Sequence, residues 1–261
     1  MKLGRIAAPR AQSFEQAKAM GLEFLEFCED STCDHERFLQ DVPALRKASK
    51  ETGVAVGSVG RWGADKFDEQ GKVIGEELDI CKHLIDAAQE LESPVFVTGA
   101  NEVPGLSYYQ NVTNAIHLFE ELLSYAGPRG VQIATYNCRW ANFVHSDLAW
   151  TLIHGHLDKL MIKYDASHCI YAGGDYLKEI KQWGSRFAHV HIKGTLRIDG
   201  ERFDDPPAGM DETNWGAFFA ALYASGYNGN LSIEPHSRTW RGNLSEKGLA
   251  FTIRYLKQFL F

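Results

Sequence analysis

The sequence lacks long apolar stretches, has few cysteines and shows no excess of basic residues. Its apolar runs fall short of the roughly 20 residues of a membrane-spanning helix, and MKLGRIAAPRAQ at the N-terminus has no apolar signal-peptide core. Its five cysteines are scattered and odd in number, which argues against a disulfide framework and favours a reducing cytoplasm. A net charge of −7 without charge runs argues against nucleic-acid binding.

What the sequence does contain is a regular alternation of apolar runs with segments of helical periodicity. In GEELDICKHLIDAAQELE, for example, Leu78, Cys81, Leu84 and Ile85 recur at helical spacing. The eight predicted strands cover 2–8, 22–28, 54–62, 93–101, 131–137, 160–165, 187–193 and 230–236. The predicted helices cover 13–21, 35–51, 75–92, 111–125, 146–154, 175–184, 211–225 and 245–260, with caps at Ser13, Ser146 and Asp175.

The predicted strands are apolar throughout instead of alternating, which is typical of a parallel sheet buried on both faces. Eight strand–helix units in one chain predict a closed (β/α)8 barrel, the TIM barrel, as a single domain over 1–261. An open doubly wound sheet is the alternative. It normally has fewer strands and a glycine-rich first turn, and no GxGxxG or phosphate-loop motif follows any strand.

Titratable residues end three of the predicted strands. Asp165 ends KLMIKYD, His191 lies in FAHVHIK, and Glu234 lies in NLSIEPH. Because strand ends share one mouth in a barrel, we expect these three side chains to meet around one divalent metal. Two carboxylates and an imidazole suit Mn²⁺, Zn²⁺, Co²⁺ or Mg²⁺. Taken singly, Asp165 could be a helix cap and His191 a core histidine, but three such residues together favour the metal site.

The segments YDASH, HVHIKG and GYNGNLSIEPH resemble the sugar phosphate isomerase/epimerase superfamily, whose members have a xylose-isomerase-like barrel. The resemblance implies an isomerase or epimerase acting on a keto-sugar or related carbohydrate, with a divalent metal, manganese ahead of zinc, cobalt or magnesium. It places the metal ligands at Asp165, His191 and Glu234, and substrate contacts at His168 and Arg197. It makes a homodimer one expected assembly, although the sequence leaves the oligomeric state open.

One position departs from the family pattern. Tyr136 stands six residues after Gly130, where relatives place a glutamate ligand of the metal, and Asn137 or water would have to fill that place. Without this carboxylate, two further functions stay open. One is a metal-dependent lyase or dehydratase on an oxidised keto-sugar or glycoside, and the other is a non-catalytic sugar-binding protein. Gly194 also replaces the aspartate of the family's HVHIKD segment.

We expect proton abstraction next to a carbonyl, for which a base and a stabiliser of the enolate charge are needed. Glu234 is the expected ligand and base, with His168 or Tyr136 handling the second proton and Lys193 or Arg197 holding oxyanion charge. Arg197 lies in 194–210, a long segment expected to be a lid or binding loop. The remaining strand-end residues predicted to contact a small carbohydrate substrate are Tyr136, Asn137, Glu26, Trp62 and His236.

Overall fold

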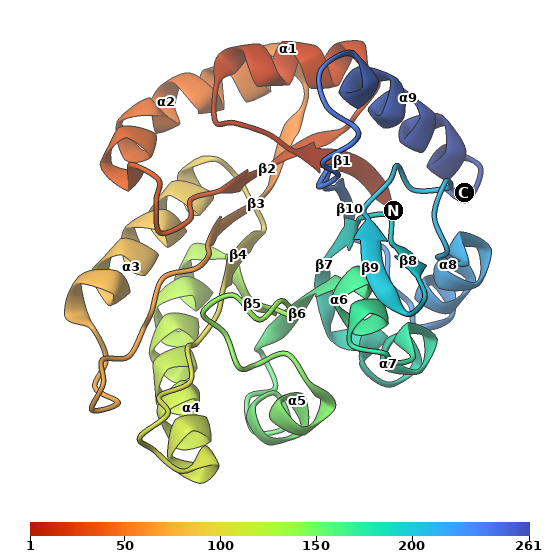
Figure 1. Ribbon diagram of the computed structural model, residues 1–261. Helices are drawn as coiled ribbons and strands as arrows, with labels where there is room; N and C mark the ends of the chain where they lie inside the picture. Colours follow the sequence, from red (N-terminus) through yellow and green to blue (C-terminus); the bar gives the residue numbers. More distant parts are fainter.

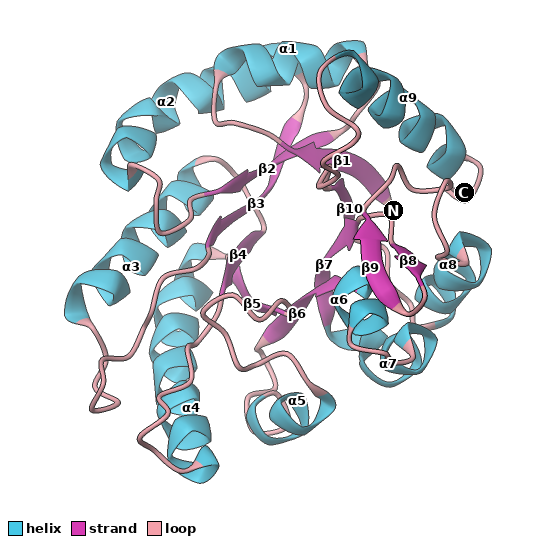
Figure 2. Cartoon of the chain, viewed as in Figure 1, coloured by secondary structure: helices cyan, strands magenta, loops and turns pink.

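Eight parallel strands form a closed barrel, as the sequence predicts (Figures 1 and 2). The computed structural model describes all residues, 1–261. The strands follow one another around the barrel in the order β1-β10-β7-β6-β5-β4-β3-β2. Their bounds are β1 Lys2–Ile6, β2 Phe24–Cys28, β3 Ala55–Arg61, β4 Val95–Thr98, β5 Gln132–Tyr136, β6 Met161–Asp165, β7 Phe187–Ile192 and β10 Asn230–Ile233.

Helices surround the barrel (Figure 1). Ser146 and Asp175 cap helices by accepting hydrogen bonds from backbone N–H groups, as predicted. Ser13 does not, because its helix already begins at Ala11 and its hydroxyl donates to the carbonyl oxygen of Ala8. No helix is both long and apolar enough to cross a membrane. The helices are α1 Ala11–Ala19, α2 His35–Thr52, α3 Gly75–Glu90, α4 Tyr108–Ala126, α5 Asp147–Ile153, α6 Ala166–Tyr171, α7 Tyr176–Trp183, α8 Trp215–Ala224 and α9 Asn243–Lys257, with short 3-10 turns η1 Gly127–Arg129 and η2 Gly184–Arg186.

The strands separate an apolar outer core from a more polar interior. On β6, Ile162 and Tyr164 pack in the outer core, so the alternation of side chains directs Lys163 and Asp165 into the barrel. A small apolar cluster fills part of the interior, and it consists of Trp62, Val95, Val97, Ala134 and Tyr136. Charged side chains on several strands therefore share the inside of the barrel with only a limited apolar filling.

The segment 194–210, expected to be a loop, contains an antiparallel hairpin formed by β8 (Leu196–Ile198) and β9 (Glu201–Asp204). The hairpin lies beside α6, where the hydroxyl of Tyr171 donates to the carbonyl oxygen of Asp204 (Figure 1). The sequence prediction also missed α6, because its six residues are too few to show helical periodicity. Both elements follow strands of the barrel and stand near its mouth.

Candidate active site

A cavity of about 710 Å³ opens at the carboxyl ends of the strands. Lys163 on β6 and His191 on β7 line it, together with Glu234, which directly follows β10. These three strands are neighbours in the barrel, because β7 pairs with both β6 and β10. The cavity therefore lies where the sequence predicts the active site of a barrel.

The three predicted metal ligands come together. One ligand atom from each of Asp165, His191 and Glu234 lies within 4.8 Å of the others. Asp165 and His191 are paired in the register of β6 and β7, and the backbone N–H of Glu234 donates to the carbonyl oxygen of Ile192. Strand register thus brings residues from distant parts of the sequence to one point.

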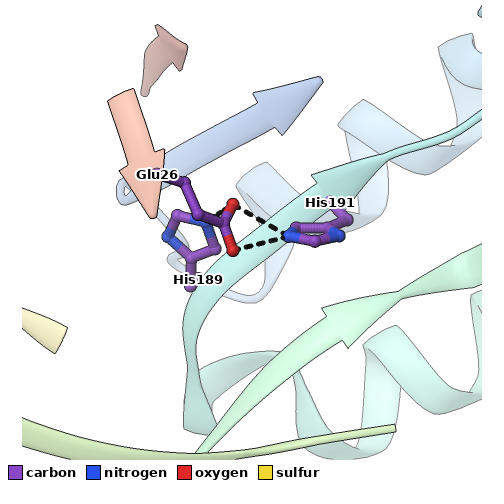
Figure 3. Close-up of side chains that lie close together, drawn as sticks. All are labelled: Glu26, His189 and His191. Carbon is purple, nitrogen blue, oxygen red and sulfur yellow. Dashed lines mark hydrogen bonds and ion pairs between the residues drawn. The ribbon is translucent and has the colours of Figure 1, made fainter. Parts of the chain in front are cut away.

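Glu26 holds two histidines inside the barrel (Figure 3). One of its carboxylate oxygens lies 2.9 Å from Nε2 of His189, and both lie 2.9 Å from Nε2 of His191. Glu26 was predicted to contact substrate, but it is 0% exposed and does not line the cavity. Its carboxylate instead contacts the two histidines. No role was predicted for His189.

The contact with Glu26 determines which nitrogen of His191 faces the cavity side. With Nε2–H donating to Glu26, Nδ1 presents its lone pair 3.3 Å from Oε2 of Glu234. Two acceptors at this distance need a proton or a cation between them. Burial alone would lower the pKa of His191, but Glu26 raises it above its usual value. Burial would raise the pKa of Glu26, and the two histidines hold it well below.

Lys193, predicted to be catalytic, contacts both carboxylates of the predicted metal site. Its Nζ lies 2.9 Å from Oδ2 of Asp165 and 3.1 Å from Oε2 of Glu234. Burial would raise the pKa of each carboxyl group, but Lys193 holds both below their usual values. The carboxylates are therefore ionised at neutral pH.

His168, the second residue predicted to move protons, lines the cavity next to Asp165. Its Nε2 lies 3.4 Å from Oδ2 of Asp165. Burial lowers the pKa of His168 to about 3, although Asp165 opposes the shift. The imidazole is thus neutral at physiological pH and can either donate or accept a proton.

Lys163 is a cavity residue that the sequence analysis missed. It points inward two residues before Asp165, is 2% exposed, and forms no ion pair or hydrogen bond. The strand period of two residues was the available signal, because it places Lys163 on the same face as Asp165.

Two of the predicted substrate contacts line the cavity and a third lies behind it. Trp62 and His236 both line the cavity, and Nε2 of His236 lies 3.6 Å from Oε1 of Glu234. Tyr136 does not line it, because its ring stacks on Trp62 with centroids 5.7 Å apart. The Tyr136 hydroxyl donates to the carbonyl oxygen of Trp140 at 2.7 Å. Tyr136 thus supports Trp62 instead of facing a ligand.

The other two predicted contacts are engaged elsewhere. The side-chain amide of Asn137 clamps the backbone of Asp165, donating to its carbonyl oxygen and accepting from its N–H, both at 2.9 Å. Arg197 pairs with Glu212 through Nε at 2.8 Å and does not line the cavity. Asn137 therefore positions Asp165, and Arg197 fastens the β8–β9 hairpin.

Comparisons with known proteins identify relatives of the fold. A family described as "Xylose isomerase-like TIM barrel" matches residues 14–258, whereas no curated protein sequence matches significantly. A D-allulose 3-epimerase from Methylomonas sp. is 18% identical with a TM-score of 0.81, covering 100% of this chain and 98% of the other. A 3-keto-D-glucoside 4-epimerase from E. coli is 18% identical with a TM-score of 0.76, covering 99% of each chain. A D-psicose 3-epimerase from Clostridium cellulolyticum H10 is 15% identical with a TM-score of 0.78, covering 99% of this chain and 98% of the other.

Proposed function

Because the chain belongs to the xylose isomerase-like TIM barrel family, we propose that it is a sugar isomerase or epimerase that moves a proton next to the carbonyl group of a keto-sugar. One observation carries the proposal: Asp165, His191 and Glu234 converge beside a cavity at the barrel mouth. The similarity in fold to epimerases of D-allulose, D-psicose and a 3-keto-D-glucoside supports it.

The donor set fits a divalent cation. Oδ2 of Asp165 is buried without a well-formed hydrogen bond, although Nζ of Lys193 is 2.9 Å away, and Nδ1 of His191 offers a lone pair toward Glu234. We propose that these three residues hold the cation, with manganese ahead of zinc, cobalt or magnesium. A divalent cation supplies polarisation of the carbonyl and stabilises the negative charge that develops on its oxygen.

The residues around the cation site can move the protons. Glu234 is ionised and lines the cavity, so it can accept the proton from the carbon next to the carbonyl. Its low pKa makes it a weak base, and abstraction therefore depends on strong polarisation of the carbonyl. The neutral imidazole of His168 can return a proton. Lys193 is placed to hold negative charge on a substrate oxygen.

Proton exchange with solvent tests the proposal. We would incubate the Mn²⁺-loaded protein with D-fructose, D-tagatose and D-allulose in D₂O and follow the sugars by NMR. We expect deuterium at the carbon next to the carbonyl, conversion to an epimer or isomer of the same mass apart from this label, and loss of exchange after EDTA. Release of water or of an aglycone would identify the lyase instead, and sugar binding without exchange would identify a binding protein.

Metal analysis tests the ligand assignment separately. After mild dialysis, Asp165→Asn and Glu234→Gln should retain much less manganese than the wild type. Asp158→Asn is the matched control, because Asp158 is exposed and precedes the same strand at its other end. Equal manganese in all four proteins would show that the ligands are assigned incorrectly.

A further inference from the structure

The charge of the cavity is opposite to that of the chain. The whole sequence has 27 Lys and Arg against 34 Asp and Glu. Among the Lys, Arg, Asp and Glu side chains that line the cavity, five are cationic and only Asp30 and Glu234 are anionic. The five cationic residues are Arg5, Arg139, Lys163, Lys193 and Arg202. A cavity lined by one sign of charge concentrates ligands of the other sign.

Ion pairs within the protein neutralise only part of this positive charge. Lys193 pairs with Asp165 and Glu234, and Arg202 pairs with Asp205. Arg5, Arg139 and Lys163 form no ion pair. Arg139 is exposed and Arg5 is half-buried with its Nε donating to the carbonyl oxygen of Ile6, so solvent can screen both. Lys163 is different, because it is 2% exposed, forms no ion pair and meets solvent only through the cavity.

Water in the cavity can hydrate this ammonium while no ligand is bound. A ligand that displaces this water leaves the charge uncompensated unless it brings an opposite charge of its own. The two carboxylates near Lys163 are already paired with Lys193 and are the proposed ligands of a divalent cation. With the cation bound, the positive surplus around Lys163 would be still larger. An anionic group on the ligand would supply this opposite charge.

We propose that the cavity binds an acidic sugar, and that a carboxylate or phosphate group on this sugar pairs with Lys163. Lys163 lies one inward-facing position deeper in the barrel than Asp165, so the anionic group would reach the floor of the cavity beside the reacting end of the sugar. This inference rests on the proposed function only for the ligand being a sugar. It specifies the substrate class of the same site.

Three polyols that lack a ketone or aldehyde group, and so cannot react, test the inference. D-sorbitol is neutral, D-gluconate carries a carboxylate, and D-sorbitol 6-phosphate carries a phosphate. Binding is measured by calorimetry with the EDTA-treated protein and again with Mn²⁺. We expect at least one acid to bind about 10-fold or more tightly than sorbitol in both conditions, as a charge-assisted hydrogen bond implies. The acid that binds more tightly identifies which anionic group the cavity prefers.

Two variants connect the preference to Lys163. Lys163→Met removes the charge while keeping a similar side-chain length. It should bring the affinities for the acid and for sorbitol within about twofold of each other, because the charged hydrogen bond is lost. Lys159→Met, an exposed position just before β6, should keep the wild-type preference. Equal wild-type affinities, a preference that survives Lys163→Met, or one that needs Mn²⁺ would overturn the inference. If Lys163→Met does not fold, the wild-type comparison still decides whether the cavity prefers an acidic ligand.

The outcome separates this inference from the proposed function. Since the polyols do not react, an acid preference that depends on Lys163 would support the inference even if no sugar exchanges its proton with solvent. Conversely, proton exchange on neutral keto-sugars without any acid preference would overturn this inference and leave the isomerase intact.

Discussion

Nε2 of His191 lies 2.9 Å from both carboxylate oxygens of Glu26, a residue that reaches it across the barrel interior from β2. This contact fixes the ring orientation and keeps a proton on Nε2, so that Nδ1 is the nitrogen that faces Glu234 and is available to a cation in the neutral imidazole. A carboxylate that holds a metal-binding imidazole in this way also makes the imidazole a stronger ligand. Glu26 would therefore influence the proposed cation site through His191.

Glu26→Gln should weaken manganese binding by about 10- to 100-fold, the usual effect of removing such a partner. The amide has a single acceptor oxygen and no charge, so it cannot hold both His189 and His191 as the carboxylate does. Affinity is measured by competition with a chelating dye, and circular dichroism checks the fold. Glu15→Gln, at an exposed position of α1, is the control. An unchanged affinity in Glu26→Gln would show that His191 does not depend on Glu26.

The barrel could be predicted because each of its units carries a local signal. Apolar runs, helical periodicity and turns such as Gly53, with φ 76°, occur within short stretches of sequence. Asp165, His191 and Glu234 could be predicted to lie together for the same reason, since each lies within one residue of the end of a strand. Fold class and strand ends together were sufficient to bring these three residues to one mouth.

The contacts across the barrel could not be predicted in this way. Glu26 and His189 are 163 positions apart, and no periodicity relates them. Tyr136 ends its strand as expected, but its ring stacks on Trp62, which lies in another part of the sequence, and its hydroxyl donates to the backbone of Trp140 in the loop that follows. The β8–β9 hairpin is short and mostly exposed, so its sequence shows no alternation of apolar and polar residues that would distinguish it from a polar loop.

Gly194, where the family pattern has aspartate, is required by close backbone packing. A Cβ at this position would lie 1.9 Å from the carbonyl oxygen of Pro206. Gly194→Ala should therefore destabilise the protein by about 1–3 kcal/mol, because backbone must move to relieve the clash. The free energy of unfolding is measured in urea. Gly105→Ala is the matched control, since a Cβ there would meet nothing within 4 Å. Equal stability of the two variants would contradict this explanation.

Glu29, at the end of β2, should make stability depend on pH. Burial, with a contribution from Asp30, raises the pKa of Glu29 from 4.5 to about 7. Between these values the folded state keeps a proton that the unfolded state has lost, so the free energy of unfolding falls as pH rises. This loss of folding stability is complete above pH 7 and amounts to at most roughly 3 kcal/mol.

Glu29→Gln removes this penalty while keeping the shape of the side chain. It should be more stable than the wild type at pH 8 by about 1–3 kcal/mol and lose that advantage as the pH approaches 4.5. Urea unfolding at several pH values measures the difference, with Glu15→Gln as the exposed control. A gain that is independent of pH would have to come from another cause than the Glu29 carboxyl group.

Lys193 should oppose the cation that the neighbouring carboxylates are proposed to hold. Its ammonium lies 2.9 Å from Asp165 and 3.1 Å from Glu234, so a divalent cation bound by these residues would be close to a like charge. Unit charges 4 Å apart interact by about 1–4 kcal/mol, between bulk water and an effective dielectric constant of 20. Lys193→Met should therefore bind manganese about 10-fold more tightly or better, even if turnover falls.

The same substitution should make the stability of the protein depend on metal. Without Lys193, buried Asp165 and partly buried Glu234 have no ion-pair partner but histidine, so the metal-free variant should unfold at a lower temperature than the wild type. Adding Mn²⁺ should then raise its unfolding temperature more than that of the wild type or of Lys159→Met. If Lys193→Met instead binds manganese more weakly than the wild type, the ammonium supports the cation site and does not compete with it.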